Sequence, residues 1–450
     1  MLEFLNDNII SLITPILLIL SGLYFSFRLK FFYIRHPIRI IRSMLTRQKS
    51  GGISPFRAVT LALAGTLGVG NIAGVASSIA IGGFGSVFWM WISALVAMVL
   101  KYAEITLAIR HRRTDSVTGE HHGGASYYIY DHCAKNGKKV LGKALGTLFS
   151  LLCIINAITM GCVIQSNAVS TSFEGVMNIP PWLVGATVAL LCLIVISGNA
   201  KWVSSFSEKT VPVMTLGYVV LSLAVLSARR ELIGDAFAVI FKNAFTLRSA
   251  AGGVAGFGIS RALKAGAMRG LMSNEAGCGT APTAHAAAET DSPAAQGFWG
   301  IFEVFVDTIL LCTLTALVII VSSLGGSQGI LIYKENPMMM TIKAYSSVLG
   351  GWSEYFMAVS VLLFAFATMI CWAHYGKESI LYVTKKRPFT VAYVLAYCLF
   401  IFIGALTAPK LAWLAADLAL GIMTVINLTV LFLMSDEVVD ETDKFFGRRR

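Results

Sequence analysis

The sequence predicts an all-α polytopic membrane protein with about eleven transmembrane helices, a fold class that three observations support. Of the 450 residues, 56% are hydrophobic and only 13% are charged, whereas soluble domains carry about 25% charged residues. Apolar runs of about 20 residues recur along the chain. Basic residues cluster in the loops between these runs, so the net charge of +12 indicates membrane-flanking loops and not a nucleic-acid-binding surface.

The predicted spans are the apolar runs long enough to cross a bilayer. They are 9–27, 54–81, 84–110, 145–172, 182–198, 201–228, 250–288 (broken), 294–323, 352–383, 388–407 and 410–434. Glu3 and Asp7, and not basic residues, precede the first run, so we expect a retained span and no signal peptide. The eight cysteines are scattered without CxxC spacing, which predicts small buried hydrophobic residues and no disulfide framework or zinc site.

The basic loops predict the orientation in the membrane. They follow the first and third spans and recur at 385–387 and 448–450. With eleven spans, all of these loops lie on the same side of the membrane, and loops rich in Lys and Arg usually face the cytoplasm. We therefore expect a multi-pass protein of the plasma (inner) membrane, with the N-terminus outside and the C-terminus inside. The segment 28–49 is either an amphipathic helix on the inner leaflet or an ordinary basic loop.

Glycines interrupt two of the predicted spans. The first break is 64–71, with Gly65, Gly68 and Gly70; the second lies within 252–279, where eight glycines flank the segment 273–276. Opened backbone at membrane depth is tolerated only where protein or a water-filled cavity satisfies its polar groups. Two such breaks in corresponding positions of two halves point to the binding site of a transporter.

The breaks divide the chain into two halves of opposite orientation, because each half has an odd number of spans. The prediction is a five-plus-five inverted repeat preceded by one extra helix. The predicted parts are 1–53 (extra helix and basic segment), 54–228 (first repeat), 229–249 (outside connection), 250–434 (second repeat) and 435–450 (cytoplasmic tail).

Glycine-rich spans have two other interpretations. Gly70 and Gly74 form a small-xxx-small motif that lets helices pack closely, and 68–73 matches the GxGxxA dinucleotide fingerprint. The fingerprint match is weak, because it lies inside a span and no acidic residue follows at the required distance. The density of glycines, the polar Thr66 and Asn71 at the break, and the repetition in the second half favour a binding site.

Three motifs resemble the alanine or glycine:cation symporter family. They are GTLGVGNIAGVA at 65–76, FWMW at 88–91 with KYAE at 101–104, and RGLMSNEAGCGTAPTAH at 269–285. The resemblance runs from about 54 to 434. It implies a leucine-transporter-like core with one extra N-terminal span and uptake of small amino acids with sodium. Met272 and the segment 278–280 (Cys-Gly-Thr) depart mildly from the family pattern, which more often has Phe and Met-Gly-Ser.

Sodium needs oxygen ligands, and an unwound helix supplies carbonyl oxygens. The break offers the carbonyls of Ala64, Thr66 and Leu67 together with the Asn71 amide. The resemblance implies that Thr66 and Asn71 serve one sodium ion beside the substrate, and that Ala64 and Leu67 serve a second. It also implies that Ala365 and the Thr368 hydroxyl complete this second site, although Met369 replaces a frequent hydroxyl. Alternatively, the Thr368 hydroxyl bonds its own helix.

The free N–H groups of the first break, including those of Gly68 and Gly70, suit a substrate carboxylate because they lie at a positive helix end. Gln165 lies mid-membrane and must be hydrogen-bonded, either to another helix or, as the resemblance favours, to the substrate. The remaining predicted substrate-binding residues are Thr66, Asn274 and Trp372. Trp372 either caps the pocket or anchors an interface.

Intramembrane carboxylates are functional candidates by default. Glu104 lies three residues after Lys101, which favours a structural pair on one helix face. Asp307 either completes an ion site or pairs with a basic group such as Arg269, and Asp417 has no local partner in the sequence. The loop histidines 111, 121, 122 and 132 favour a solvated loop over a metal site.

We therefore expect a secondary transporter that imports small neutral amino acids, alanine or glycine, with Na⁺ as the co-transported ion. Proton coupling, or selectivity for serine or glutamine, is the alternative within the same fold. We expect no enzyme and no primary pump: no HExxH motif and no Walker motif is present. A channel is a further alternative, and the sequence leaves the oligomeric state open.

Overall fold

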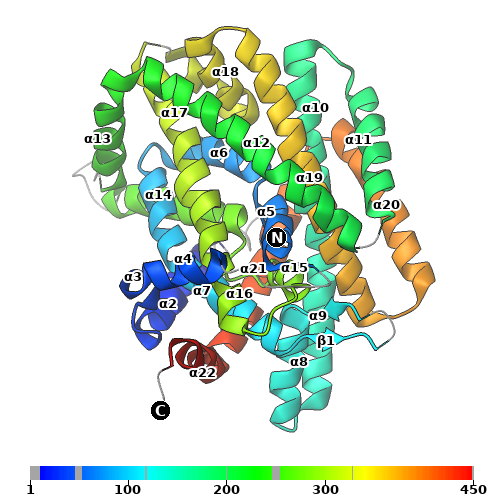
Figure 1. The fold of residues 1–450 in the computed structure, drawn as a ribbon. Coiled ribbons are helices and arrows are strands. Elements are labelled where there is room, and N and C mark those ends of the chain that lie inside the picture. Colours follow the sequence, from blue (N-terminus) through cyan, green and yellow to red (C-terminus); the bar gives the residue numbers. More distant parts are fainter. Residues whose placement is uncertain are drawn as a thin grey trace.

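The computed structural model describes residues 11–45, 53–116, 119–198, 200–245, 254–326 and 328–447. Over these residues the chain is an all-helical bundle with one short hairpin, in which β1 (Arg113–Thr114) pairs antiparallel with β2 (His121–His122) (Figure 1). The start of the first predicted span, the end of the predicted basic segment 28–49, Gly252, Gly253 and the arginines 448–450 lie outside the described residues.

The helices of the first half follow the predicted spans with small shifts at their ends. They are α2 (Ser11–Arg28), α5 (Pro55–Thr66), η2 (Val69–Asn71), α6 (Ala73–Gly82), α7 (Ser86–Arg110), α8 (Ala125–Lys135), α9 (Lys139–Ile158), η3 (Thr159–Val163), α10 (Ile164–Met177), α11 (Pro181–Ile196) and α12 (Ala200–Ala228). The span predicted at 145–172 is longer, because α9 and α10 continue through the π-helical η3.

The part of the chain after α12 contains a second broken helix. It comprises η4 (Arg230–Leu232), α13 (Ile233–Ala244), α14 (Val254–Asn274), α15 (Pro282–Ala286), α16 (Pro293–Val304), η5 (Phe305–Cys312), α17 (Thr313–Leu324), η6 (Gln328–Glu335), α18 (Pro337–Leu349), α19 (Trp352–Val383), α20 (Arg387–Leu406), α21 (Lys410–Leu433) and α22 (Ser435–Phe446). Among the described residues, 7 continuous helical stretches are long and apolar enough, by length and composition, to cross a membrane.

Two predicted non-spanning segments are helical. The basic segment after the first span forms α3 (Phe32–Arg35) and α4 (Pro37–Leu45). α4 is amphipathic: Ile38, Ile41 and Leu45 are exposed while Ile40 is buried. The predicted tail forms α22, whose Glu437 and Glu441 pair with Arg110 at the end of α7. All eight cysteines are free and buried, as predicted.

The first broken helix begins and ends where its residues require. Ser54 accepts a hydrogen bond from the Arg57 N–H at 3.2 Å and Pro55 occupies the first turn, so the start of α5 is capped. α5 ends at Thr66, and Gly68 is extended at φ −119° and ψ −154°. The break therefore lies within the predicted 64–71.

The second broken helix opens at a loop of left-handed residues. α14 ends at Asn274, and Glu275, Gly277 and Gly279 follow with φ of 53°, 85° and 80°. Non-glycine residues seldom adopt positive φ, so Glu275 is held there by its surroundings. The break is thus confined to 275–281, the C-terminal end of the predicted region.

α19 contacts both broken helices, through α5 and η2 of the first and α15 of the second. It packs against α5, α9, α10 and α12, while α7 packs against α14 and α16. In Figure 1, α18 lies at one end of the bundle, and α8 and β1 lie at the other. The two breaks lie between these ends, where helices from both halves meet.

Candidate functional site

The first break is held by side chains from α19 and α10. The Thr368 hydroxyl donates to the Ala64 carbonyl at 2.9 Å, so it does not bond its own helix. The Val69 N–H donates to Gln165 Oε1 at 3.1 Å. Between them, a Cβ on Gly68 would lie 2.6 Å from Thr368 Oγ1 and 3.0 Å from Gln165 Oε1. Only glycine fits here, because the two polar side chains already touch its position.

Asn71 joins the two broken helices. Its Oδ1 accepts the Gly68 N–H at 3.1 Å. Its Nδ2 donates to Asp307 Oδ1 at 2.7 Å and to Ser273 Oγ at 3.1 Å. Ser273 also donates to Asp307 Oδ2 at 2.8 Å. A carboxylate, an amide and a hydroxyl from three segments therefore meet at the unwound backbone.

Of the two alternatives for Asp307, the structure places it beside Asn71. Arg269, the other partner considered, lies over the Trp413 ring with 4.7 Å between its guanidinium carbon and the ring centroid. The Asp307 carboxylate is fully buried, and a buried charge needs partners. Thr308 supplies one more, donating to Oδ2 at 2.7 Å.

The second break is held by Trp372. Its Nε1 donates to Glu275 Oε1 at 3.0 Å, and Thr280 donates to Oε2 at 2.7 Å. Trp372 is fully buried and lies against the π-helical turn, where a Cβ on Gly161 would be 2.2 Å from the Trp372 Cβ. An aromatic residue buried in this way does not anchor a membrane interface.

Asn274 closes the end of α14. Its carbonyl accepts Lys101 Nζ at 2.6 Å, and its Nδ2 donates to Thr308 at 3.1 Å. The expected pair of Lys101 with Glu104 is wrong: Lys101 forms its ion pair with Glu303 at 3.1 Å. Although Glu104 lies one turn along the same helix, α16 packs directly on α7 and brings Glu303 closer.

The remaining predicted residues line the same backbone. The Thr66 hydroxyl donates weakly to carbonyls of its own helix at 3.4 and 3.5 Å, and its carbonyl accepts the Gly68 N–H at 2.9 Å. The N–H of Leu67 caps α5. A Cβ on Gly70 would lie 3.5 Å from the Ser273 Cα, so the two breaks touch. Ala365 is fully buried one turn before Thr368.

Three hydroxyl side chains that the sequence did not indicate bond backbone carbonyls in the first broken helix or in the neighbouring η3 and α19. Thr315 donates to the Asn71 carbonyl at 2.8 Å, and Thr341 donates to the Ile72 carbonyl at 3.2 Å. Tyr397 bridges the carbonyls of Gly161 and Met369 at 3.0 and 2.8 Å. Their only sequence signal was a hydroxyl inside an apolar run, which is too common to single them out.

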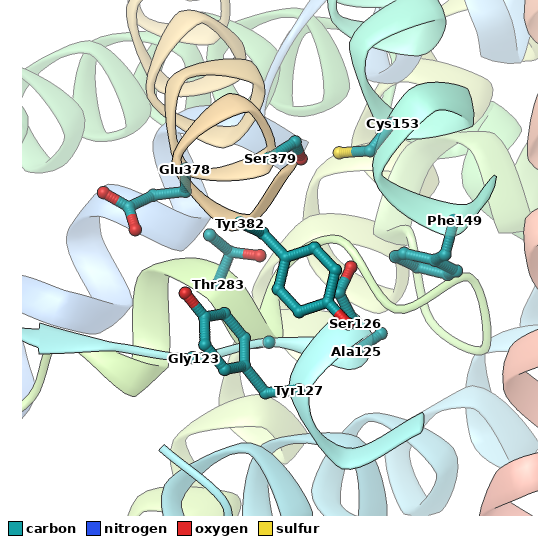
Figure 2. Close-up of a pocket in the computed structure, with 11 residues that line it drawn as sticks. Gly123, Ala125, Ser126, Tyr127, Phe149, Cys153, Thr283, Glu378, Ser379 and Tyr382 are labelled. Carbon is teal, nitrogen blue, oxygen red and sulfur yellow. The ribbon is translucent and has the colours of Figure 1, made fainter. Parts of the chain in front are cut away.

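Cavities approach the breaks from both ends. A cavity of about 440 Å³ opens toward α18 and reaches Val69 and Ile164, the neighbours of Gly68 and Gln165. At the other end a pocket of only about 10 Å³ lies between α8, α9, α15 and α19, with Phe149, Tyr127 and Tyr382 around it (Figure 2). A cavity of about 660 Å³ adjoins it at the hairpin. The site is therefore more accessible from the α18 end.

Two of the four loop histidines, His111 and His122, form short contacts with carboxylates. His111 lies between Asp131 and Glu437, with both N···O distances 2.9 Å. His122 contacts Glu378 at 2.8 Å, and this hydrogen bond raises the pKa of His122. Among the described residues, no group of three or more His, Cys, Asp or Glu side chains could hold a metal ion.

The chain is similar to known transporters over nearly its whole length. The family pattern described as the sodium:alanine symporter family matches residues 1–450. The sodium/alanine symporter AgcS of Methanococcus maripaludis is 34% identical over 438 residues, which is 96% of this chain and 93% of that protein. The probable sodium/glutamine symporter GlnT of Bacillus subtilis is 34% identical over 437 residues, which is 96% of this chain and 87% of that protein.

Solved structures show the same fold. A manganese transporter of Eremococcus coleocola aligns with a TM-score of 0.54 and 13% identity, covering 89% of this chain and 81% of that one. The expected all-helical, leucine-transporter-like fold is thus confirmed. The chain is a multi-pass membrane transporter and not an enzyme. With its sequence pattern and its relatives in agreement, it belongs to the sodium:alanine symporter family.

Proposed function

We propose that this chain is a sodium-coupled symporter that imports small neutral amino acids, alanine or glycine, by alternating access. One observation carries the proposal: both broken helices meet at Asn71, which bonds Asp307 and Ser273, while α10 and α19 hold the other side of the same unwound backbone. Converging breaks of this kind hold substrate and ions in transporters.

The oxygens around the first break support the ion assignment. Thr368 Oγ1 and the Ala64 carbonyl lie 2.9 Å apart, so one ion could contact both oxygens. The carbonyls of Leu67 and Ala365 complete this proposed site. The Thr66 carbonyl and the Asn71 amide form the other proposed site, where the carboxylate of Asp307 lies within reach of Asn71.

The proposed substrate lies against Gly68 and Gly70, within reach of Thr66, Gln165, Asn274 and Trp372. The tight spacing supports a small substrate, because Thr368 and Gln165 leave no room for a single Cβ on Gly68. An apolar pocket discriminates one methylene by only about 1–3 kcal/mol, so alanine, glycine and serine should compete, whereas large amino acids should be excluded by overlap.

The cavities support a direction of transport. The basic loops at the α8 end suit the cytoplasm, with the N-terminus outside and the C-terminus inside the plasma membrane. The α18 end is then outside, and the cavity of about 440 Å³ is the outer approach to the site. Rocking of one half against the other would close this cavity and widen the pocket in Figure 2.

Uptake of labelled alanine into proteoliposomes tests the proposal. An inward sodium gradient should drive accumulation, and replacing sodium with choline at constant pH should abolish it. Uptake that persists in choline and follows a proton gradient would refute sodium coupling. Competition by unlabelled glycine but not by glutamine is expected, and stronger competition by glutamine would refute the substrate assignment. Flux that never saturates would indicate a channel.

A further inference from the structure

Four charged side chains that are not among the proposed ion and substrate ligands surround the second break. Lys101 and Glu104 come from α7, Glu275 from the break itself and Glu303 from α16, and all four are fully buried. Three carboxylates thus face one lysine in a region without exposed surface. Burying unpaired charge costs several kcal/mol or more, so this imbalance requires compensation.

Lys101 and Glu303 compensate each other. Lys101 Nζ lies 3.1 Å from Glu303 Oε1. Glu303 Oε2 lies 3.2 Å from His285 Nε2, and Gln296 Nε2 donates to His285 Nδ1 at 2.8 Å. In this arrangement Nδ1 accepts and Nε2 donates, so the His285 ring is neutral. The excess negative charge therefore belongs to Glu104 and Glu275.

The two remaining carboxyl groups differ in their hydrogen bonds. Glu275 accepts on both oxygens, from Trp372 and from Thr280, as an ionised carboxylate does. Glu104 accepts two hydrogen bonds on Oε1 alone, from the Gly279 N–H at 3.0 Å and from Asn427. Its Oε2 is buried and has no partner among the described residues.

We propose that Glu104 is a proton-binding site, carrying its proton on Oε2 when the loop 275–281 is folded as seen here. A carboxylic acid has one oxygen that accepts and one that carries hydrogen, which matches the asymmetry of Glu104. A metal ion fits less well, because the N–H groups of Gly277, Gly279 and Asn427 and the nearby Lys101 all face this carboxyl.

Loss of the proton to water would place a second unpaired negative charge beside the loop. The titratable or charged groups around Glu104 are Lys101 on its own helix, Tyr128 on α8, Glu275 and Cys278 in the loop, Glu303 and His285 behind Lys101, and Asp307 on η5. Because Glu275 holds Trp372, a displaced loop would disturb the proposed substrate site. Transport should then weaken as pH rises, an expectation that rests on the proposed function.

The infrared spectrum of the reconstituted wild-type protein tests protonation without relying on transport. The C=O stretching band of a protonated carboxylic acid should be present at neutral pH, shift in D₂O and disappear in Glu104→Gln. Glu354→Gln is the control, since Glu354 pairs with Lys343 at 2.7 Å in the α18 region and is ionised. This control should keep the band. Absence of the band in folded wild type, or its persistence in folded Glu104→Gln, overturns the proposal.

Uptake supplies the second measurement. Glutamine mimics the protonated acid, so Glu104→Gln should transport at acidic pH and lose the alkaline decline of the wild type. That decline should approach about tenfold per pH unit once the proton is lost, because one pH unit changes the ratio of acid to carboxylate tenfold. A wild-type pH profile in Glu104→Gln, or a folded variant inactive at every pH, overturns the proposal.

If Glu104→Gln does not fold, the infrared spectrum of Asn427→Ala tests the assignment of the carboxylic-acid band to Glu104. Removing the hydrogen bond to Oε1 should shift the carboxylic-acid band, and an unshifted band belongs to another group and overturns the proposal. If the wild type transports nothing, the proposed function fails, while the infrared band still decides the protonation of Glu104.

Discussion

Gly68→Ala should weaken ligand binding at the proposed site more than a methyl group added at any other glycine of the first break. Gly68 has φ −119°, which alanine also adopts, so the substitution brings no backbone strain. The new Cβ would instead lie 2.6 Å from Thr368 Oγ1 and 3.0 Å from Gln165 Oε1. Both side chains must move, and each has a hydrogen bond to lose. Gly74→Ala is the matched control, because nothing lies within 4 Å of its Cβ position.

The free-energy cost of Gly68→Ala follows from those two hydrogen bonds. One joins Thr368 to the Ala64 carbonyl at 2.9 Å, and the other joins the Val69 N–H to Gln165 at 3.1 Å. A net contribution of about 1 kcal/mol for each gives about 2 kcal/mol in total, within the usual cost of overpacking. Because about 1.4 kcal/mol is tenfold in affinity, we expect binding to weaken about thirtyfold.

The assay is sodium-driven alanine uptake in proteoliposomes, with both variants reconstituted at equal protein density. Gly68→Ala should raise the half-saturating concentrations of sodium and of alanine together, because one movement disturbs both proposed sites. Gly74→Ala should match the wild type, since alanine is also the better helix former. Equal sodium and alanine dependence in the two variants would refute the placement of Thr368 and Gln165 around the ligands.

Three further predictions concern individual side chains. Thr368→Val removes the hydroxyl at nearly constant shape and leaves a buried carbonyl unpaired, so it should raise the half-saturating sodium concentration about tenfold. Thr424→Val is the control, because it loses a hydrogen bond only within its own helix. Equal effects of the two substitutions would exclude an ion-binding role for Thr368. Gln165→Leu should weaken the binding of alanine and of glycine to the same extent. An effect on one substrate alone would show that the Gln165 amide does not contact the backbone atoms that the two amino acids share. The hydrogen bond with Glu378 raises the pKa of His122, so its stabilisation is complete below the ordinary value of about 6.5 and is lost as pH rises through the folded pKa. The protection factor of the β2 amides, which corrects the exchange rate for the base-catalysed rate of a free amide, should therefore fall at alkaline pH. An unchanged protection factor in Glu378→Gln would contradict this.

The sequence alone predicted the apolar helices, and 7 helices among the described residues are long and apolar enough to cross a membrane. A bilayer requires about 20 consecutive apolar residues for each helix, so the signal is local and survives without knowledge of any neighbour. The breaks predicted at 64–71 and within 252–279 were visible for a similar reason, since dense glycines beside Asn71 and Asn274 are incompatible with an ordinary apolar helix. The exact end of the second break was not visible, because glycines also occur inside the intact part of α14.

Only the tertiary structure decided which polar side chains meet. Lys101 and Glu104 share a helix face, yet Lys101 pairs with Glu303 because α16 packs on α7. Asp307 and Asn71 are 236 positions apart, and no local pattern predicts their hydrogen bond. The contact of Trp372 with Glu275 likewise depends on the close approach that Gly161 allows. Burial makes each of these groups need a partner, but the packing of distant helices determines which partner is within reach.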